Sequence, residues 1–206
     1  MGVAPPLRTL RQIHGARVVR IDHPGDGGSG STDDDRPQGD VLITSLPGVT
    51  LGVWVADCVP ILIADPVTRA VAAVHAGWRG TVAGALAAAI TTLREAFGVA
   101  PRNLRMAIGP SIGPCCFEVG DEVVTALLDA DPGATACIST GRARRHVDLW
   151  EANRRQALAG GVPDGLIQTA RLCTRCHGDL LESFRRDGPE AGRTAAAITR
   201  RDGSNL

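Results

Sequence analysis

The chain has 206 residues, enough for one domain with a core of its own, and its 22 basic and 22 acidic residues balance. This neutrality gives no reason to expect nucleic acid or an anionic membrane surface as the main partner. All of the basic residues are Arg, so a lysine Schiff base is excluded. The chain has no Tyr, which excludes a tyrosine acid, base or nucleophile.

Features of a membrane or exported protein are also missing from the sequence. No stretch approaches the roughly 20 apolar residues that span a bilayer, and the segment from Met1 to Arg8 has no apolar signal-peptide core. Six Cys without an export signal indicate reduced thiols rather than a disulfide framework. We therefore predict a cytoplasmic protein.

The N-terminal half of the chain predicts a series of short strands. A first strand is expected over 16–21, followed by a flexible loop over 24–39 that is rich in Gly, Ser, Asp and Pro. Four further apolar runs, separated by Pro-Gly and Asp-Pro turns, predict strands at 41–44, 49–55, 60–64 and 70–75.

A helix over 81–97 is the clearest periodic element. Apolar residues recur there every three or four positions, and Gly98 supplies a C-terminal stop. Later segments predict strands at 106–108, 166–169 and 195–199 and helices at 122–130 and 149–158. Strands come first and then mix with helices, without an internal repeat, so we predict a single α+β domain over 1–206.

Three segments place a reactive side chain beside turn residues at the end of a strand: Gln12–Gly15, Ala56–Pro60 and His75–Gly80. They contribute His14, Cys58 and His75. Two imidazoles and a thiolate suit Zn²⁺ and leave a fourth position for water or substrate. The spacings of 44 and 17 residues form no standard metal motif, so by spacing alone two core histidines and an inert Cys are the simpler interpretation.

The segment that begins at His75 has features of a nucleotide-sized site. Its two glycines permit close backbone approach, Trp78 offers a stacking face, and Arg79 offers a bidentate fork for phosphate just before a helix. The alternative is that the glycines only shape a strand-to-helix turn and that Arg79 is solvated.

Two other segments each carry a pair of cysteines. Gly109–Cys116 is dense in Gly and Pro, which is typical of a loop that frames a pocket. Its two cysteines, Cys115 and Cys116, are adjacent in the sequence, and adjacent cysteines rarely form a disulfide with each other. Cys173–His177 matches the C-x-x-C-H pattern of haem attachment, which is completed outside the cytoplasm. No strand and helix flank it as a thioredoxin-like motif requires, so we expect the pattern to be a chance match.

In this order and over nearly the whole chain, these segments resemble the laccase-domain family, once described as multicopper polyphenol oxidases. The HAGWRG motif at 75–80 and the ADC-x-P motif at 56–60 are the most specific. The other matching segments are Gln12–Gly15, Gly39–Thr44, Ile108–Cys116, Asp148 and Leu149 with Asn153, Cys173 and Thr174, Ser183–Gly188, and Gly192 with Arg193.

The resemblance implies an α+β fold with two β-sheets face to face and helices packed outside. It implies purine nucleoside phosphorylase activity on adenosine, inosine and methylthioadenosine, together with adenosine deaminase activity. The family's zinc ligands fall on His14, Cys58 and His75. The expected partners are a purine nucleoside and phosphate, with no nucleic acid and no membrane.

Phosphorolysis of a nucleoside requires groups that hold phosphate and stabilise the leaving base. We assign Arg79 to the phosphate and Trp78 to a wall of the pocket. Asp57 is our candidate for general acid/base work or for binding a substrate hydroxyl.

Three alternatives use the same residues differently. A hydrolase or transferase could use Cys58 as the nucleophile and His75 as its base. A copper-dependent polyphenol oxidase gathers copper with H-x-H pairs, which this chain of five His does not contain. A metal-stabilised binding module would hold the ion without turnover.

The family resemblance also generates an expectation about the N-terminus. Members have roughly sixty further residues before the segment matching Gln12–Gly15, including an Arg-Gly-Gly segment near the site. Without that segment we expect a chain that folds but has an uncovered sheet edge, self-association and weak activity. The alternatives are a natively short member of the family or a start site set too late in the reading frame.

Overall fold

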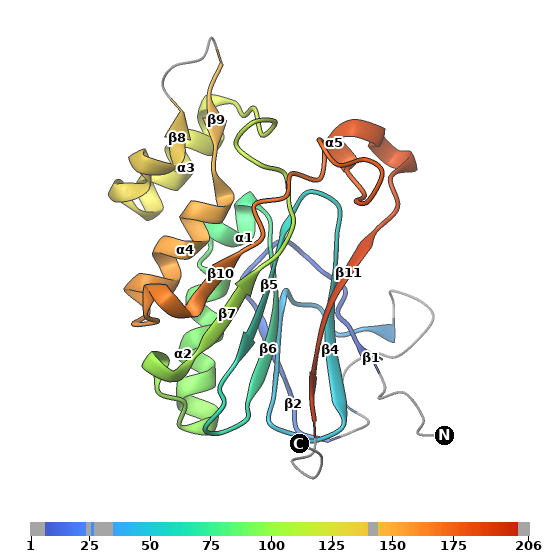
Figure 1. Ribbon diagram of the computed structural model, residues 1–206, viewed down its shortest axis with the longest axis vertical. Coiled ribbons are helices and arrows are strands. Elements are labelled where there is room, and N and C mark those ends of the chain that lie inside the picture. Colours follow the sequence, from blue (N-terminus) through green and yellow to red (C-terminus); the bar gives the residue numbers. More distant parts are fainter. Residues whose placement is uncertain (1–6, 24–25, 27–34, 140–143, 202–206) are drawn as a thin grey trace.

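Two β-sheets lie face to face at the centre of the molecule (Figure 1). The computed structural model describes residues 7–23, 26, 35–139 and 144–201, so most of the expected loop at 24–39 lies outside the described residues. The larger sheet has six strands, in spatial order β10 (Ile167–Thr169), β7 (Arg105–Ile108), β5 (Val59–Ala64), β6 (Val71–Ala76), β3 (Val41–Thr44) and β2 (Val18–Ile21). The smaller sheet has the order β1 (Leu7–Arg8), β4 (Val49–Val55) and β11 (Thr194–Arg200).

Both sheets are mixed. In the larger one, β2 runs parallel to β3 and β10 runs parallel to β7, while the four central strands pair antiparallel. Every residue of β6 is buried because the smaller sheet covers one face of this strand and a helix covers the other. Apart from His75, β6 is apolar throughout, as burial on both faces requires.

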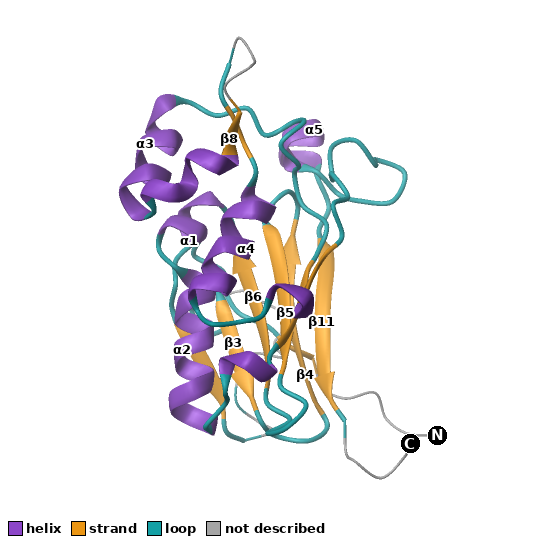
Figure 2. Cartoon of the chain, turned by 60° about the vertical axis from the view of Figure 1, so that its left-hand side comes forward, coloured by secondary structure: helices purple, strands orange, loops and turns teal. Residues whose placement is uncertain are grey.

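The helices gather on the side of the larger sheet that faces away from the smaller one (Figure 2). They are α1 (Trp78–Val82), α2 (Ala85–Phe97), α3 (Asp121–Ala130) and α4 (Leu149–Ala159), whereas α5 (Phe184–Asp187) lies apart from them, near the end of β11 (Figure 1). The helix α2 buries Leu86, Ile90 and Leu93 against β2, β3 and β6. A separate apolar cluster, which includes Leu42 and Leu51, fills the space between the two sheets. The predicted α+β architecture is therefore confirmed.

Most predicted elements are found within one or two residues of their expected bounds. The strands at 41–44 and 49–55 match their expected bounds. Sequence patterning missed β1, the two-stranded sheet of β8 (Ile138–Ser139) and β9 (His146–Val147), and the single turn of α5. A strand of two residues is too short to show any periodicity. Within the described ranges, no helix combines the length and apolar character needed to cross a bilayer.

The single helix expected over 81–97 is wrong at its start. The chain forms α1 and then α2, and Gly84 separates them with a φ of +75°, in the left-handed region. Val82 therefore belongs to α1, although its spacing fits the stripe of α2. At the other end the prediction is confirmed, because Gly98 has a φ of +66° and its N–H donates to the carbonyl of Arg94.

Replacing Gly84 by Ala is expected to destabilise the fold by about 1 kcal/mol, because an L side chain is strained in the left-handed region. Space is not the cause, since a Cβ at this position would approach Ala87 only to 3.8 Å. Gly165→Ala is the matched control: a Cβ there meets nothing within 4 Å, and the φ of Gly165 is not in the left-handed region. Urea unfolding of both variants measures the difference, and equal stability would contradict the assignment.

Candidate functional site

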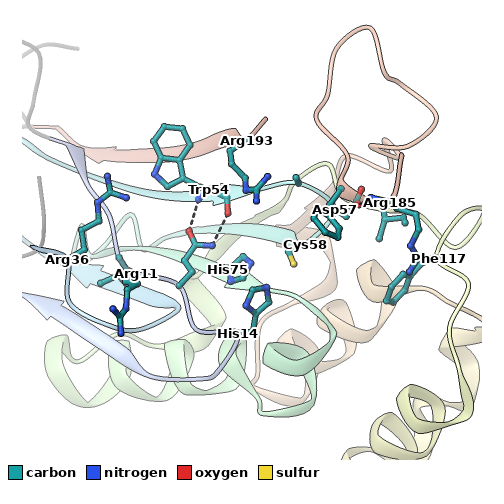
Figure 3. Close-up of a pocket in the computed structure, with 15 residues that line it drawn as sticks. Arg11, His14, Arg36, Trp54, Asp57, Cys58, His75, Phe117, Arg185 and Arg193 are labelled. Carbon is teal, nitrogen blue, oxygen red and sulfur yellow. Dashed lines mark hydrogen bonds between the residues drawn. The ribbon is translucent and has the colours of Figure 1, made fainter. Parts of the chain in front are cut away.

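His14, Cys58 and His75 meet at one end of the larger sheet. One nitrogen of each imidazole ring and the Cys58 sulfur all lie within 4.8 Å of one another. The two imidazole rings are 4.9 Å apart between centroids and meet edge to face at 79°. Three segments far apart in the sequence thus converge on one point, as Figure 3 shows.

The Asp40 carboxylate holds the segment that carries His14. Asp40 is fully buried directly before β3, and it accepts hydrogen bonds from the backbone N–H groups of Ile13 (3.3 Å), His14 (2.9 Å) and Gly15 (2.7 Å). His14 has a φ of +59°, a conformation that His adopts more readily than most residues. The three bonds wrap the backbone around the carboxylate and leave the His14 ring facing the cavity.

The same carboxylate orients His75, which lies on β6 and is 2% exposed. The Nδ1 of His75 donates to Oδ1 of Asp40 at 2.8 Å, which leaves Nε2 to face Cys58. Desolvation disfavours a charged ring here, but the hydrogen bond to Asp40 and the interaction with Cys58 outweigh it and raise the pKa of His75 to about 9. A carboxylate behind a histidine is also the usual support of a metal-binding imidazole.

Cys58 lies in the turn between β4 and β5. Desolvation opposes ionisation of its thiol, but hydrogen bonds with His14 and His75 outweigh it and lower the pKa of Cys58 to about 7. A thiolate is therefore accessible near neutral pH, which is the form that binds metals and the form that acts as a nucleophile.

Gly77 leaves the space in which this group assembles. A Cβ at Gly77 would stand 2.8 Å from the Cys58 sulfur and 3.3 Å from Cδ2 of His14. Only a residue without a side chain lets the sulfur and the imidazole approach each other at this point. The donor set of one thiolate and two imidazoles, held by a buried carboxylate, fits a divalent metal ion of the zinc type.

Gln12 fastens the His14 segment to the smaller sheet. Its side-chain amide donates to the carbonyl of Trp54 and accepts from the N–H of Trp54, both at 2.8 Å; both bonds are drawn as dashed lines in Figure 3. The segment is thus held on one side by Asp40 and on the other by β4. Because Trp54 takes part through its backbone, its indole is left to line the cavity.

A cavity of about 730 Å³ opens above the three ligands. Among the residues that the structure describes, it is lined by four arginines and one carboxylate, that of Asp57, and by three aromatic rings. The lining residues are Leu10, Arg11, Gln12, His14, Arg36, Trp54, Ala56, Asp57, Cys58, His75, Ile112, Phe117, Phe184, Arg185 and Arg193. This excess of positive charge suits an anionic group, and the rings suit a flat apolar one.

Asp57 organises one wall of the cavity. Its carboxylate accepts hydrogen bonds from the hydroxyls of Thr174 (2.6 Å) and Ser183 (2.7 Å) and from the backbone N–H of Arg185 (2.6 Å). The residue has a φ of +86°, which turns the side chain toward these donors. A carboxylate has about four acceptor positions, so one remains for a substrate group.

Trp78 and Arg79, which we assigned to substrate from the sequence, do not line this cavity. They lie in the first turn of α1, where the Arg79 guanidinium stacks on the Trp78 ring at 4.3 Å from its centroid. The sequence signal for a phosphate fork was local, whereas the direction of the side chain follows from how α1 packs. The arginines that do reach the cavity come from other segments.

Several residues of the site were missed in the sequence. Asp40 was noticed only as part of a matching segment, and nothing marked Gln12 as a clamp or Trp54 as a wall. Arg185 and Arg193 lie in matching segments near the C-terminus, which was the only available signal for them. In a chain whose 22 basic residues are all Arg, a single arginine carries little information.

The fold and this site define an α+β protein with a Cys/His ligand group below a cation-lined cavity. The chain belongs to the family described as multi-copper polyphenol oxidoreductase laccase, whose profile matches residues 1–201. It is 44% identical over 163 residues to a protein of Bacteroides thetaiotaomicron named purine nucleoside phosphorylase, covering 77% of this chain and 60% of that one.

Two further relatives cover more of the chain. A protein from an unknown prokaryotic organism, named adenosine deaminase RL5, is 40% identical and aligns over 93% of this chain and 74% of its own length. The crystal structure of YlmD from Geobacillus stearothermophilus superposes with a TM-score of 0.89 at 37% identity, covering 96% of this chain and 74% of that one. The chain thus spans about 60% of the Bacteroides protein and about three quarters of these two.

Replacing Asp40 by Asn is expected to lower the pKa of His75 in the metal-free chain from about 9 toward the ordinary value of about 6.5. The neutral amide no longer stabilises the imidazolium, so the ring loses its proton at lower pH. NMR titration of the ring measures the change.

Asp65→Asn is the control, because Asp65 is also buried and caps a turn through Thr68, far from His75 in the fold. It should cost stability without moving the titration of His75. An unchanged His75 pKa in Asp40→Asn would show that the carboxylate does not set the charge of the ring.

Proposed function

We propose that residues 1–206 form one catalytic domain of a zinc-associated purine nucleoside phosphorylase, acting on adenosine, inosine or methylthioadenosine. The observation that carries the proposal is the cavity itself: it joins a Cys/His ligand group to arginines and aromatic rings. The names of the relatives support it, since several are called purine nucleoside phosphorylases.

His14, Cys58 and His75 would hold the zinc ion. Three protein ligands are typical of a catalytic site, because one coordination position stays open. When bound, zinc supplies a Lewis acid at the floor of the cavity. A thiolate with two imidazoles is a usual zinc donor set, and the described chain offers no group of histidines of the kind that multicopper oxidases use.

Arg193 is our candidate for the phosphate. Its guanidinium extends toward the cavity (Figure 3) and donates to the carbonyls of Ala191 and Gly192. No carboxylate in the described part of the chain neutralises it. Arg185, by contrast, donates to the carbonyl of Glu118 and stacks on Phe117, so it also shapes the wall.

The aromatic rings would hold the purine, and Asp57 would hold the sugar. Trp54, Phe117 and Phe184 offer flat apolar surfaces around the cavity. The remaining acceptor position of the Asp57 carboxylate suits a ribose hydroxyl, a role that needs no proton transfer. This choice replaces the general acid/base role with the hydroxyl-binding alternative, because three donors already hold the carboxylate.

In the reaction, a phosphate oxygen forms a bond to C1′ of the ribose while the bond from C1′ to the purine nitrogen breaks. The electron pair of that bond leaves with the base, which takes up a proton from solvent, and the sugar keeps the phosphate as its 1-phosphate ester. Positive charge develops on the ribose, so holding the anionic phosphate beside it stabilises the transition state. The residues of this chain contribute by binding and orienting both reactants.

Loss of one ligand should remove one zinc ion per chain. We expect Cys58→Ser to contain about one zinc fewer than the wild type, because a serine hydroxyl is a poor substitute for a thiolate. Cys137→Ala is the matched control: Cys137 is a buried free thiol that belongs to neither group of metal-type ligands. Elemental analysis measures the content, and equal zinc in Cys58→Ser and the control would refute the ligand assignment.

Phosphorolysis predicts that purine base appears only when phosphate is present, with ribose 1-phosphate as the second product. Arg193→Ala should raise the KM for phosphate by at least about tenfold, because a charge-assisted hydrogen bond contributes about 1.5–3 kcal/mol. Arg79→Ala removes an equal charge outside the cavity and should leave that KM nearly unchanged. An equal rise in the KM for phosphate in both variants would show that Arg79 also contributes to phosphate binding.

Incubation of adenosine, inosine and methylthioadenosine with and without phosphate gives the product pattern. Release of base without phosphate would make the protein a hydrolase. Conversion of adenosine to inosine would show deamination, the activity that the name of one relative carries.

A second candidate function rests on a specific observation, the alignment of Cys58, His75 and Asp40. A thiol of lowered pKa, a histidine and an orienting carboxylate also form the nucleophilic group of a Cys/His hydrolase. The two proposals differ in their metal requirement. A chain freed of metal by a chelator should lose phosphorolysis but would keep thiol-dependent hydrolysis.

A further inference from the structure

A second group of ligand-type side chains lies apart from the three zinc-ligand candidates. Cys115 and Cys116 belong to the loop that follows β7, and Cys173 and Cys176 belong to the segment that follows β10. Their four sulfur atoms all lie within 4.8 Å of one another. We call these residues the four-cysteine cluster; all four are free thiols.

The spacing of the sulfur atoms fits a single ion. Cys176 is 3.8 Å from Cys115 and 3.5 Å from Cys116, measured between Sγ atoms. Four thiolates placed about 2.3 Å from a zinc ion at the corners of a tetrahedron are about 3.8 Å apart. An iron–sulfur cluster distributes its thiolates over several iron atoms, which holds the sulfur atoms farther apart than one shared ion does.

The backbone around Cys173 has the form of a metal-binding turn. Two residues separate Cys173 from Cys176, a spacing common in zinc sites. The N–H groups of Cys176 and His177 both donate to the Cys173 carbonyl at 3.1 Å, which closes the turn and directs both thiols to one side. The Nδ1 of His177 donates to the same carbonyl at 3.0 Å. The histidine of the C-x-x-C-H pattern thus supports the turn, and its ring nitrogens lie outside the cluster.

Gly113 supports the cluster from the other loop. Its N–H donates to the Cys173 sulfur at 3.3 Å, and both groups are buried. A Cβ at Gly113 would stand 2.7 Å from the Trp150 ring and 3.2 Å from the Cβ of Cys173, so a side chain here would push the two loops apart. Donation from a backbone N–H to a ligand sulfur stabilises the thiolate and fixes its direction.

Few other bonds join the two loops beyond the end of the β7–β10 pairing. The backbone N–H of Ser111 donates to the carbonyl of Leu172 at 3.2 Å, and the backbone N–H of Thr174 donates to the carbonyl of Ser111 at 3.0 Å. In Figure 1 these segments run side by side at the end of the sheet that carries the site. The cluster lies directly beyond these bonds, where a crosslink would have most effect on the loops.

We propose that the four-cysteine cluster binds a second zinc ion, which has a structural role. Four thiolates fill a tetrahedral shell and leave no open position, so this ion crosslinks the loops and does not contact substrate. The crosslink reaches the cavity through two short paths. Thr174 donates to Asp57, and Phe117 lies directly after the Cys115–Cys116 pair.

Counting zinc in matched variants tests the proposal. Reduced protein is loaded with Zn²⁺ alone and desalted, and metal is counted by elemental analysis and native mass spectrometry. We expect two ions in the wild type, one in Cys58→Ser and none in Cys58→Ser/Cys176→Ser. Cys58→Ser/Cys137→Ala, which removes a buried thiol outside the cluster, should retain one.

These counts separate the two zinc sites. One ion in both the wild type and Cys58→Ser would support the four-cysteine site and reject the site of the proposed function. One ion in the wild type and none in Cys58→Ser would overturn the present proposal. The wild-type count does not depend on whether any variant folds.

Cobalt reports the donor atoms directly. In the Cys58→Ser background, Co²⁺ bound by the cluster should show strong thiolate-to-metal charge transfer and the visible bands of tetrahedral cobalt. Cys58→Ser/Cys176→Ser should lose them. Absence of these bands in Cys58→Ser would overturn the proposal. So would a wild-type mass lower by two hydrogens with the cluster thiols resistant to alkylation, because the sulfurs would then form a disulfide.

Discussion

The buried carboxylate of Asp40 is the interaction on which the site depends. A fully buried charge is tolerated only when hydrogen bonds and an opposite charge compensate its lost hydration, and Asp40 has both. Three backbone N–H groups shape the His14 segment around it, and His75 takes its orientation and charge from it. Because Asp40 lies directly before β3, the central sheet fixes all of these positions at once.

The sequence predicted the sheet strands well because burial on both faces demands long apolar runs. The strand β3 is a fully buried run of this kind; β4, whose Thr50 and Trp54 are half-buried, is also mostly apolar, and turn residues bound both strands. Prediction from the sequence failed where the backbone conformation of one residue decides where a helix begins. Gly84 permits helix in principle, and only packing shows that it adopts a left-handed conformation and separates α1 from α2. Strands of two residues, such as β8, form only because they pair with a strand elsewhere in the fold, so their own sequence gives no signal.

Prediction of the site followed the same division. The residue types at three strand ends, strengthened by the family resemblance, led to His14, Cys58 and His75, which the fold brings together. Asp40 and Gln12 act through contacts between distant segments, which no local pattern records. The prediction for Arg79 rests on local signals alone: its neighbours suggest a phosphate site, whereas in the fold its guanidinium stacks on the adjacent Trp78 ring.

The antiparallel pairing of β5 with β6 has a consequence for the order in which the site assembles during folding. Cys58 directly precedes β5, and His75 lies on β6 opposite Pro60, so the two residues come together when this local pair of strands forms. His14 arrives only when β2 pairs in parallel with β3, a connection across a longer stretch of chain with a higher entropy of closure. Two of the three donors are therefore set by one local hairpin, whereas the third depends on a contact of greater sequence separation.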